Sequence, residues 1–169
     1  MTTKSRVLTL TTLRAAGMDT SSFEKTYGET TFITEDSAPA LALALPFDLR
    51  EAAYYLLSSY AQNKYRAAVA PAASVYDRMT NTAGNSFTKT RRNAQIAFET
   101  ALTSAVSKYG QDKLTEELIL AIDETYFARD EWLESARATR DHAVKQARAA
   151  FDTARAHAWA RAYIEDGTP

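Results

Sequence analysis

The stretch ESARATRDHAVKQARAAFDTARAHAWARAYIED, residues Glu134–Asp166, decides the fold class of this chain. It contains neither glycine nor proline, and alanine, the best helix former, recurs at almost every turn. Both helix breakers are also absent from Gln111 to Glu134. We therefore predict one long C-terminal helix over residues 111–166, about 84 Å long if it is continuous at ~1.5 Å per residue. The alternative is a break near residues 123–130, where an aspartate can cap a new helix.

Small and apolar residues form a stripe on this helix at three- and four-residue steps. The stripe consists of Val144, Ala147, Phe151, Ala154, Ala158 and Ala162. Because small side chains let a second helix come close, such a stripe is typical of helix–helix contacts. We predict that it packs against identical chains in a homo-oligomer. The alternative is an exposed helix whose alanines reflect helix propensity alone.

Charges are segregated along the same helix. Eight acidic and two basic residues lie between Asp112 and Glu134, whereas six basic and two acidic residues lie between Ser135 and Arg161. This order complements the helix dipole, which favours acidic groups at the start and basic groups at the end. An antiparallel partner helix of the same kind would place acidic halves against basic halves.

Residues 1–110 are predicted to form a helical domain with an extended segment at 29–45, so the whole chain is expected to be an all-α helical bundle. Glycine and proline divide this region into short segments. The predicted elements are a helix at Ser5–Gly17 that ends at Gly17, with a strand as the alternative; a short helical turn at Asp19–Gly28; a β-prone segment at Glu29–Thr34; and a strand or extended connector at Ala38–Pro46.

The middle of the chain is predicted to contain three helices. The first, Pro46–Pro71, is capped by Asp48 with Glu51 three residues later. It is apolar on two faces, so we assign Tyr54 and Tyr65 on its second face to the oligomer interface. The remaining predicted elements are a helix at Pro71–Thr80, a loop at Thr80–Ser86 (TNTAGNS) and a helix at Ser86–Gly110.

Composition excludes several classes of protein. The net charge of −1 provides no global basic field for nucleic acid, and the absence of cysteine rules out disulfides and thiolate metal sites. No apolar run reaches the roughly 20 residues that span a bilayer, so we expect no membrane partner. Threonines interrupt the hydrophobic residues near the N-terminus, and we expect no signal peptide there.

Catalytic and metal-binding motifs are not found. The two histidines, His142 and His157, are separated by about 22 Å on an intact helix, so they cannot share a metal ion. No phosphate-binding glycine loop, nucleophile elbow or zinc-protease motif occurs. We therefore expect a protein that is not an enzyme and has no cofactor.

The cluster KTRR, Lys89–Arg92, is the most basic short segment. In the first turns of the predicted Ser86–Gly110 helix it would oppose the helix dipole. Lys89, Arg91 and Arg92 are therefore candidate phosphate-binding residues. The alternatives are ion pairs with an acidic segment of a neighbour or simple exposure to solvent.

Two segments resemble the head-to-tail adaptor family, also called tail accessory proteins, of short-tailed bacteriophages. LPFDLREAAYYLLSSYAQNKYRAAVAPAASVYDRMTNTA (Leu45–Ala83) is similar to the family pattern of a Leu-Pro entry followed by two alanine-rich helices. RVLTLTTLRAAGM (Arg6–Met18) resembles the family's opening helix. The resemblance implies a structural virion protein that forms a homo-oligomeric ring and docks onto a portal protein. It also implies localisation in the virion, and in the host cytoplasm before assembly.

A second resemblance leads to a different function. TNTAGNSF (Thr80–Phe87) is similar to a loop-to-helix junction of coat proteins from rod-shaped helical plant viruses. That resemblance implies a nucleic-acid-binding coat in which Arg91 and Arg92 face RNA. A third possibility is a small non-enzymatic helical interaction module. We favour the phage adaptor, with itself and other virion proteins as partners; a nucleic-acid partner is possible but not favoured.

Overall fold

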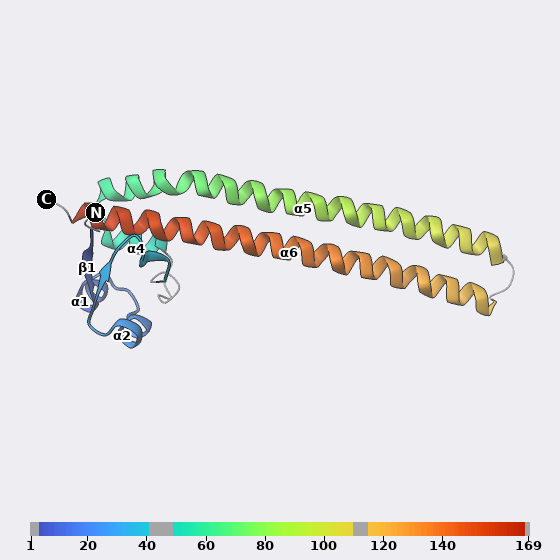
Figure 1. The fold of residues 1–169 in the computed structure, drawn as a ribbon, viewed down its shortest axis with the longest axis horizontal. Helices are drawn as coiled ribbons and strands as arrows, with labels where there is room; N and C mark the ends of the chain where they lie inside the picture. Colours follow the sequence, from blue (N-terminus) through green and yellow to red (C-terminus); the bar gives the residue numbers. More distant parts are fainter. Residues whose placement is uncertain (1–3, 41–48, 110–114, 168–169) are drawn as a thin grey trace. The chain divides into compact units, whose positions relative to one another are not determined.

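Two long helices dominate the computed structural model, which describes residues 4–40, 49–109 and 115–167. Helix α5 (Ser59–Tyr109) and helix α6 (Glu116–Asp166) pack against each other (Figure 1). The other elements are β1 (Arg6–Thr9), α1 (Leu10–Ala15), α2 (Ser21–Tyr27), β2 (Thr30–Ile33) and α4 (Leu49–Leu56). The predicted all-α fold class is confirmed, with one small two-stranded sheet added to it among the described residues.

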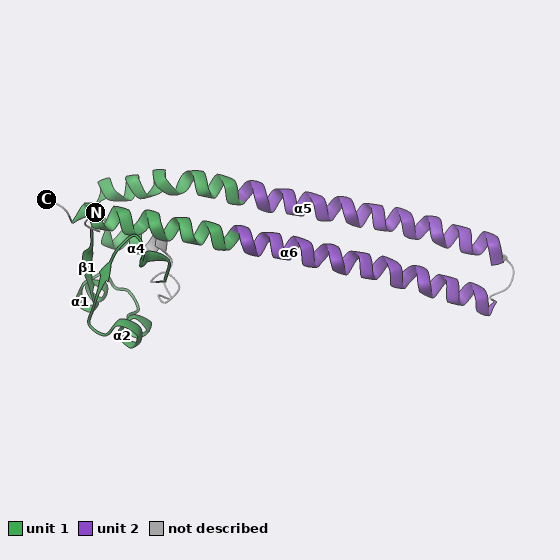
Figure 2. Cartoon of the chain, in the orientation of Figure 1, with its two compact units in different colours: residues 1–76, 148–169 green, residues 77–147 purple. Residues whose placement is uncertain are grey.

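The chain divides into two compact units, coloured separately in Figure 2. Unit 1 comprises residues 1–76 and 148–169, and unit 2 comprises residues 77–147. Each long helix therefore contributes to both units. Residue 110, at which the sequence analysis divides the chain, falls within unit 2.

Unit 1 contains most of the hydrophobic core. Strands β1 and β2 pair antiparallel, with Arg6 opposite Ile33 and Thr9 opposite Thr30. The largest fully buried side chains are Trp159, Phe23, Leu8, Leu13 and Ile33. The core thus joins the sheet and the first two helices to the last turns of α6.

The N-terminal segment is both strand and helix, in that order. Residues 6–9 form β1, as the alternative prediction had it, and alternate like a half-buried strand, since Leu8 is buried and Val7 is exposed. Helix α1 begins after Thr9, whose side-chain oxygen accepts a hydrogen bond from the Thr12 N–H at 3.0 Å. Gly17 follows the helix with a positive φ of 74°, which confirms the predicted helix end.

The next two predictions have mixed outcomes. Helix α2 confirms the helical turn before Gly28, and β2 lies in the β-prone segment Glu29–Thr34. The strand or extended connector at Ala38–Pro46 is wrong for Ala38–Ala40, which have a helical backbone. The rest of that segment lies outside the described residues. The predicted cap Asp48 and the side chain of Glu51 also lie outside them.

The predicted Pro46–Pro71 helix is wrong as a single element, because an elbow at Ser58 separates α4 from α5. The Ser58 hydroxyl accepts a hydrogen bond from the Ala61 N–H at 3.3 Å, so Ser58 is the N-cap of α5. The Gln62 side chain donates to the carbonyls of Tyr54 and Leu57, both at 3.0 Å. Polar side chains therefore satisfy backbone groups at the end of one helix and at the start of the next.

Helix α5 continues where the sequence predicted two interruptions. Pro71 lies inside the helix, and the predicted loop Thr80–Ser86 is wrong because those residues are helical throughout. The Thr82 hydroxyl bonds back to the Arg78 carbonyl at 2.8 Å, as threonine does inside helices. Packing along α6 outweighs the weak local preference of this segment for a loop.

Helix α6 is unbroken, so the alternative break near residues 123–130 is wrong. The Thr115 hydroxyl caps the helix by accepting from the Leu118 N–H at 3.2 Å. Residues 111–114 of the predicted helix lie outside the described residues. Asp130 serves as an ion-pair partner of Arg129, with 2.7 Å between nitrogen and oxygen.

Candidate functional site

The two helices of unit 2 run antiparallel and share only a thin core. The Arg140 guanidinium lies 4.8 Å from the centre of the Phe87 ring. Farther along α5, the rings of Phe98 and Tyr126 are 4.7 Å apart, and Arg129 covers both. The buried hydrophobic residues described in unit 2 are Ala94, Phe98, Ala105, Leu118 and Ala147. Three of these are alanines, so the unit buries little apolar area for its length.

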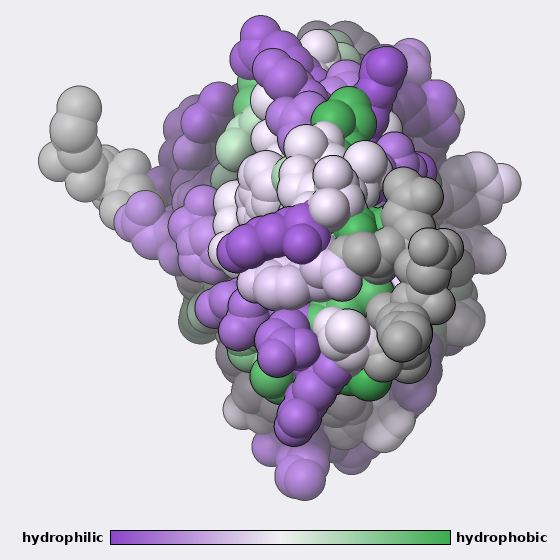
Figure 3. All heavy atoms as spheres, turned by 90° about the vertical axis from the view of Figure 1, so that its right-hand side faces the viewer, coloured by the Kyte–Doolittle hydropathy of each residue, from purple (hydrophilic) through white to green (hydrophobic). Residues whose placement is uncertain are grey.

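Large hydrophobic side chains are instead exposed on unit 2. They are Met79, Ile96, Ile119, Leu120, Tyr126, Phe127 and Trp132, with exposed fractions from 41% to 71%. Figure 3 views the side at which α5 ends and α6 begins, and it shows hydrophobic residues at the surface among hydrophilic ones. Exposed apolar side chains are candidates for an interaction surface where they lie side by side.

A groove of about 610 Å³ lies between the helices of unit 2. Phe87 and several small residues line it, together with Met79 and Trp132, which are 42% and 45% exposed. Its full lining is Arg78, Met79, Thr82, Ala83, Ser86, Phe87, Thr90, Trp132, Ser135, Ala136, Thr139, Arg140 and Ala143. The groove is therefore open, largely apolar and bordered by two arginines.

The outward side of α6 carries a second surface, which we call the acidic face. Leu120 and Phe127 are exposed by 58% and 71% and are seven residues apart, so they lie on one side of the helix. Acidic residues repeat every seven positions on both sides of this pair. They are Glu116, Asp123 and Asp130 on one side and Glu117, Glu124 and Glu131 on the other. Only Asp130 of these six has an ion pair within the described residues.

The predicted phosphate-binding residues lie well inside α5, not in the first turns of a helix. The argument from the helix dipole therefore does not apply to them. Lys89, Arg91 and Arg92 are all exposed, and none has an ion pair with a described residue. Lys89 follows Arg78 by eleven residues, and Arg92 follows Lys89 by three, so these three residues lie on one side of α5. Arg91 lies elsewhere on the helix.

The predicted oligomer stripe has a partner within the chain. The Phe151 ring stacks on Tyr76 of α5, with ring centres 5.3 Å apart. Ala147 and Ala162 are buried, and the other members, Val144, Ala154 and Ala158, are half-buried. The small residues thus allow a second helix to approach, and α5 of the same chain occupies that place. Contact of the stripe with identical chains stays a prediction.

The two predicted interface tyrosines differ in their exposure. Tyr65 is buried, and its hydroxyl has no hydrogen-bond partner within the described part of the chain. Tyr54 is 65% exposed, and its ring lies 5.0 Å from that of the neighbouring Tyr55. Of the two, only Tyr54 is accessible to another molecule in the single chain.

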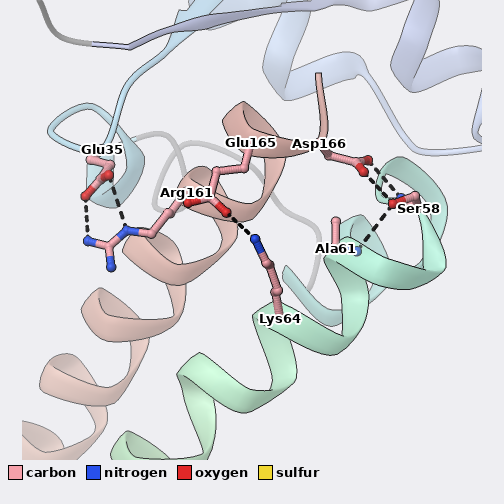
Figure 4. A network of polar contacts seen from close by, with 7 residues as sticks. All are labelled: Glu35, Ser58, Ala61, Lys64, Arg161, Glu165 and Asp166. Carbon is pink, nitrogen blue, oxygen red and sulfur yellow. Dashed lines mark hydrogen bonds and ion pairs between the residues drawn. The ribbon is translucent and has the colours of Figure 1, made fainter. Parts of the chain in front are cut away.

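Polar contacts attach the end of α6 to the rest of unit 1 (Figure 4). Arg161 donates to both carboxylate oxygens of Glu35, at 2.8 and 3.2 Å, and this pairing lowers the pKa of Glu35. Lys64 binds Glu165 at 3.1 Å. Asp166 accepts hydrogen bonds from the backbone N–H of Ser58, at 2.9 Å, and from its hydroxyl.

The pKa of Asp166 reflects two opposing effects. Burial, the largest single effect, raises it, but the two hydrogen bonds from Ser58 and the charge of Arg6 together lower it further, so the net pKa is lowered. Beside it, the Arg6 guanidinium lies 4.1 Å from the centre of the Tyr163 ring, and burial raises the pKa of the Tyr163 hydroxyl. These groups anchor the end of α6 within unit 1.

The groove and the apolar pair of the acidic face were not predicted from the sequence. The signal in the sequence that identifies the face is the seven-residue spacing of Leu120 and Phe127, with one acidic pair between them and one on each side. The groove has no such signal, because its lining comes from segments more than forty residues apart.

Metal ligation and membrane insertion find no support in the described residues. No group of three or more histidine, aspartate or glutamate side chains there is placed to hold a metal ion. None of the helices, so far as they are described, is long and apolar enough to cross a membrane. Protein-family models, curated proteins and solved structures were each compared with the chain, and none of them matches it.

Proposed function

We propose that this protein is a non-enzymatic structural subunit of a homo-oligomeric assembly. The observation that carries the proposal is the surface of unit 2, where large hydrophobic side chains are exposed over a thin, alanine-rich core. A two-helix unit of this kind gains stability when neighbouring chains cover its apolar side chains. Assembly is therefore the function that best accounts for this surface.

The specific role that we propose is a ring subunit of the head-to-tail adaptor of a short-tailed bacteriophage. Its support is the resemblance of Arg6–Met18 and Leu45–Ala83 to that family. The partners would be identical chains and a portal protein, and the protein would reside in the virion after assembly in the host cytoplasm.

An RNA-binding coat is the second candidate, because Lys89, Arg91 and Arg92 are exposed and have no ion pair with a described residue. Phosphate contacts by these side chains would make binding strongly dependent on salt. The variant Arg91→Ala with Arg92→Ala would then lower both the affinity for nucleic acid and its salt dependence. A wild-type protein that ignores RNA and DNA at low salt would eliminate this candidate.

Light scattering after size-exclusion chromatography tests the proposal directly. The purified protein is measured over a wide concentration range, and negative-stain images are taken of the eluted species. Closed rings support the adaptor role, whereas filaments favour the coat. A monomer at every concentration would contradict self-assembly and leave the small interaction module as the remaining function.

A further inference from the structure

We propose that the acidic face of one copy docks into the groove of a second copy of this chain. The proposal rests on the proposed self-assembly and names the contact that carries it. The donor is the outward side of α6 around Leu120 and Phe127, and the acceptor is the groove that Phe87 and Trp132 help to line. Both surfaces belong to unit 2.

The apolar parts of the two surfaces match in length. Leu120 and Phe127 are separated by about 10.5 Å along the helix axis at ~1.5 Å per residue. The groove is lined from Arg78 to Thr90 on α5, a distance of about 18 Å by the same rise per residue. Both side chains of the donor therefore fit along the groove at once. The small residues in its lining, such as Ala83, Ser86 and Ala136, let a third helix approach closely.

The charges of the two surfaces are complementary. The donor carries six carboxylates, of which only Asp130 is ion-paired among described residues. The acceptor side carries Arg78 at the groove, with Lys89 and Arg92 on the same side of α5. These three basic groups have no ion pair with a described residue. A docked second copy would give these three basic groups carboxylate partners.

The chain cannot neutralise its own acidic face in this way. The contact between Phe98 and Tyr126 places the last part of α5 opposite the acidic part of α6. Residues 93–109 of α5 contain only Glu99 and Lys108 as charged groups. The basic groups that the acidic face needs are therefore offset along the helices, and a second copy can bring them into register.

A copy of the same chain fits these surfaces better than nucleic acid does. Nucleic acid would occupy Arg78, Lys89 and Arg92 but would be repelled by the acidic face and would leave Leu120 and Phe127 exposed. Because donor and acceptor are different surfaces of one chain, each docked copy still presents a free donor or acceptor. Repetition of such a contact closes into a ring or extends as a filament.

Charge reversal on each surface tests the contact. The donor variant carries Glu117→Lys, Glu124→Lys and Glu131→Lys, and the acceptor variant carries Arg78→Glu, Lys89→Glu and Arg92→Glu. In the donor variant alone, three lysines replace the carboxylates on one side of the donor and face the basic acceptor, while Glu116, Asp123 and Asp130 are unchanged. In the acceptor variant alone, the donor and the three changed residues of the acceptor side are all acidic. We expect the apparent dissociation constant of self-assembly to rise on the order of 10- to 100-fold in each case.

Mixing the two variants supplies the decisive measurement. The reversed donor of one fits the reversed acceptor of the other, and the remaining donor and acceptor are wild type, so mixed assembly should return. Restored assembly also shows that both variants are folded. A control with Asp77→Lys should assemble like the wild type. This position lies about 200° around α5 from the groove residue Met79.

The results separate this proposal from the proposed function. If the wild type assembles and the two variants assemble equally well, self-assembly stands and the docking contact is overturned. If each variant is monomeric and their mixture stays monomeric, the contact is likewise overturned. Loss of wild-type assembly on nuclease treatment would replace it with a nucleic-acid-mediated contact, and a wild type that never assembles would overturn both proposals.

Discussion

The elbow at Ser58 makes a quantitative prediction for the variant Ser58→Ala. The Ser58 hydroxyl has two roles: it accepts from the Ala61 N–H at the start of α5, and it donates to the Asp166 carboxylate at the end of α6. Alanine removes both interactions. The backbone N–H of residue 58 still donates to Asp166, so the carboxylate retains one of its two bonds.

The expected loss follows from these two interactions. Replacement of a serine N-cap by alanine costs about 1 kcal/mol, and a solvent-exposed hydrogen bond of this kind contributes about 1 kcal/mol more. We therefore expect the free energy of unfolding to fall by about 2 kcal/mol, which corresponds to about 4–8 °C in the melting temperature of a chain of this size.

Thermal unfolding followed by circular dichroism at neutral pH measures this loss. All proteins must be compared at one concentration, because assembly shifts the melting temperature. The matched control is Ser59→Ala, the neighbouring residue, whose side chain makes no hydrogen bond with a described residue. In a background of Asp166→Asn the effect of Ser58→Ala should shrink. The reasoning fails if Ser58→Ala and Ser59→Ala melt at the same temperature.

Three further predictions concern other positions. Gly84→Ala should stabilise the protein by about 1 kcal/mol, because a Cβ at this helical position meets nothing within 4 Å; chemical denaturation checks it, and an unchanged midpoint would contradict it. Tyr65→Phe should leave the free energy of unfolding unchanged or raise it, since the buried hydroxyl is unpaired among the described residues; a loss of more than about 1 kcal/mol would reveal a missed partner. Stability should fall as the pH drops below about 4, because the lowered pKa values of Glu35 and Asp166 mean that the unfolded chain binds protons first; acid titration of the wild type and of Asp166→Asn measures it, and equal acid sensitivity in the two would exclude Asp166 as a contributor.

Helix ends were the least predictable feature of the fold. The end of α1 at Gly17 was predictable because glycine tolerates the positive φ that follows a helix. The segment Thr80–Ser86 has the composition of a loop, yet it is helical. The elbow at Ser58 interrupts a segment whose composition is helical throughout. Its capping contacts come from Gln62 and Asp166, and the second of these is remote in sequence.

The candidate site was only partly predictable for a similar reason. The stripe from Val144 to Ala162 was identified as a helix-packing surface, and the structure supplies α5 of the same chain as the packed helix. Lys89, Arg91 and Arg92 were identified from their charge, which is a local property. The groove needed the pairing of α5 with α6, because residues of both helices line it.

The sequence by itself determined that the chain is mostly helical and that it ends in one long helix. Alanine content and the absence of glycine and proline act through the backbone of each residue and need no partner. Only the tertiary structure decided that α5 runs through Pro71 and Thr80–Ser86, and that the alanine stripe meets a helix of its own chain. Both depend on burial between segments far apart in sequence, whose gain in free energy outweighs the local preference of a few residues for a turn.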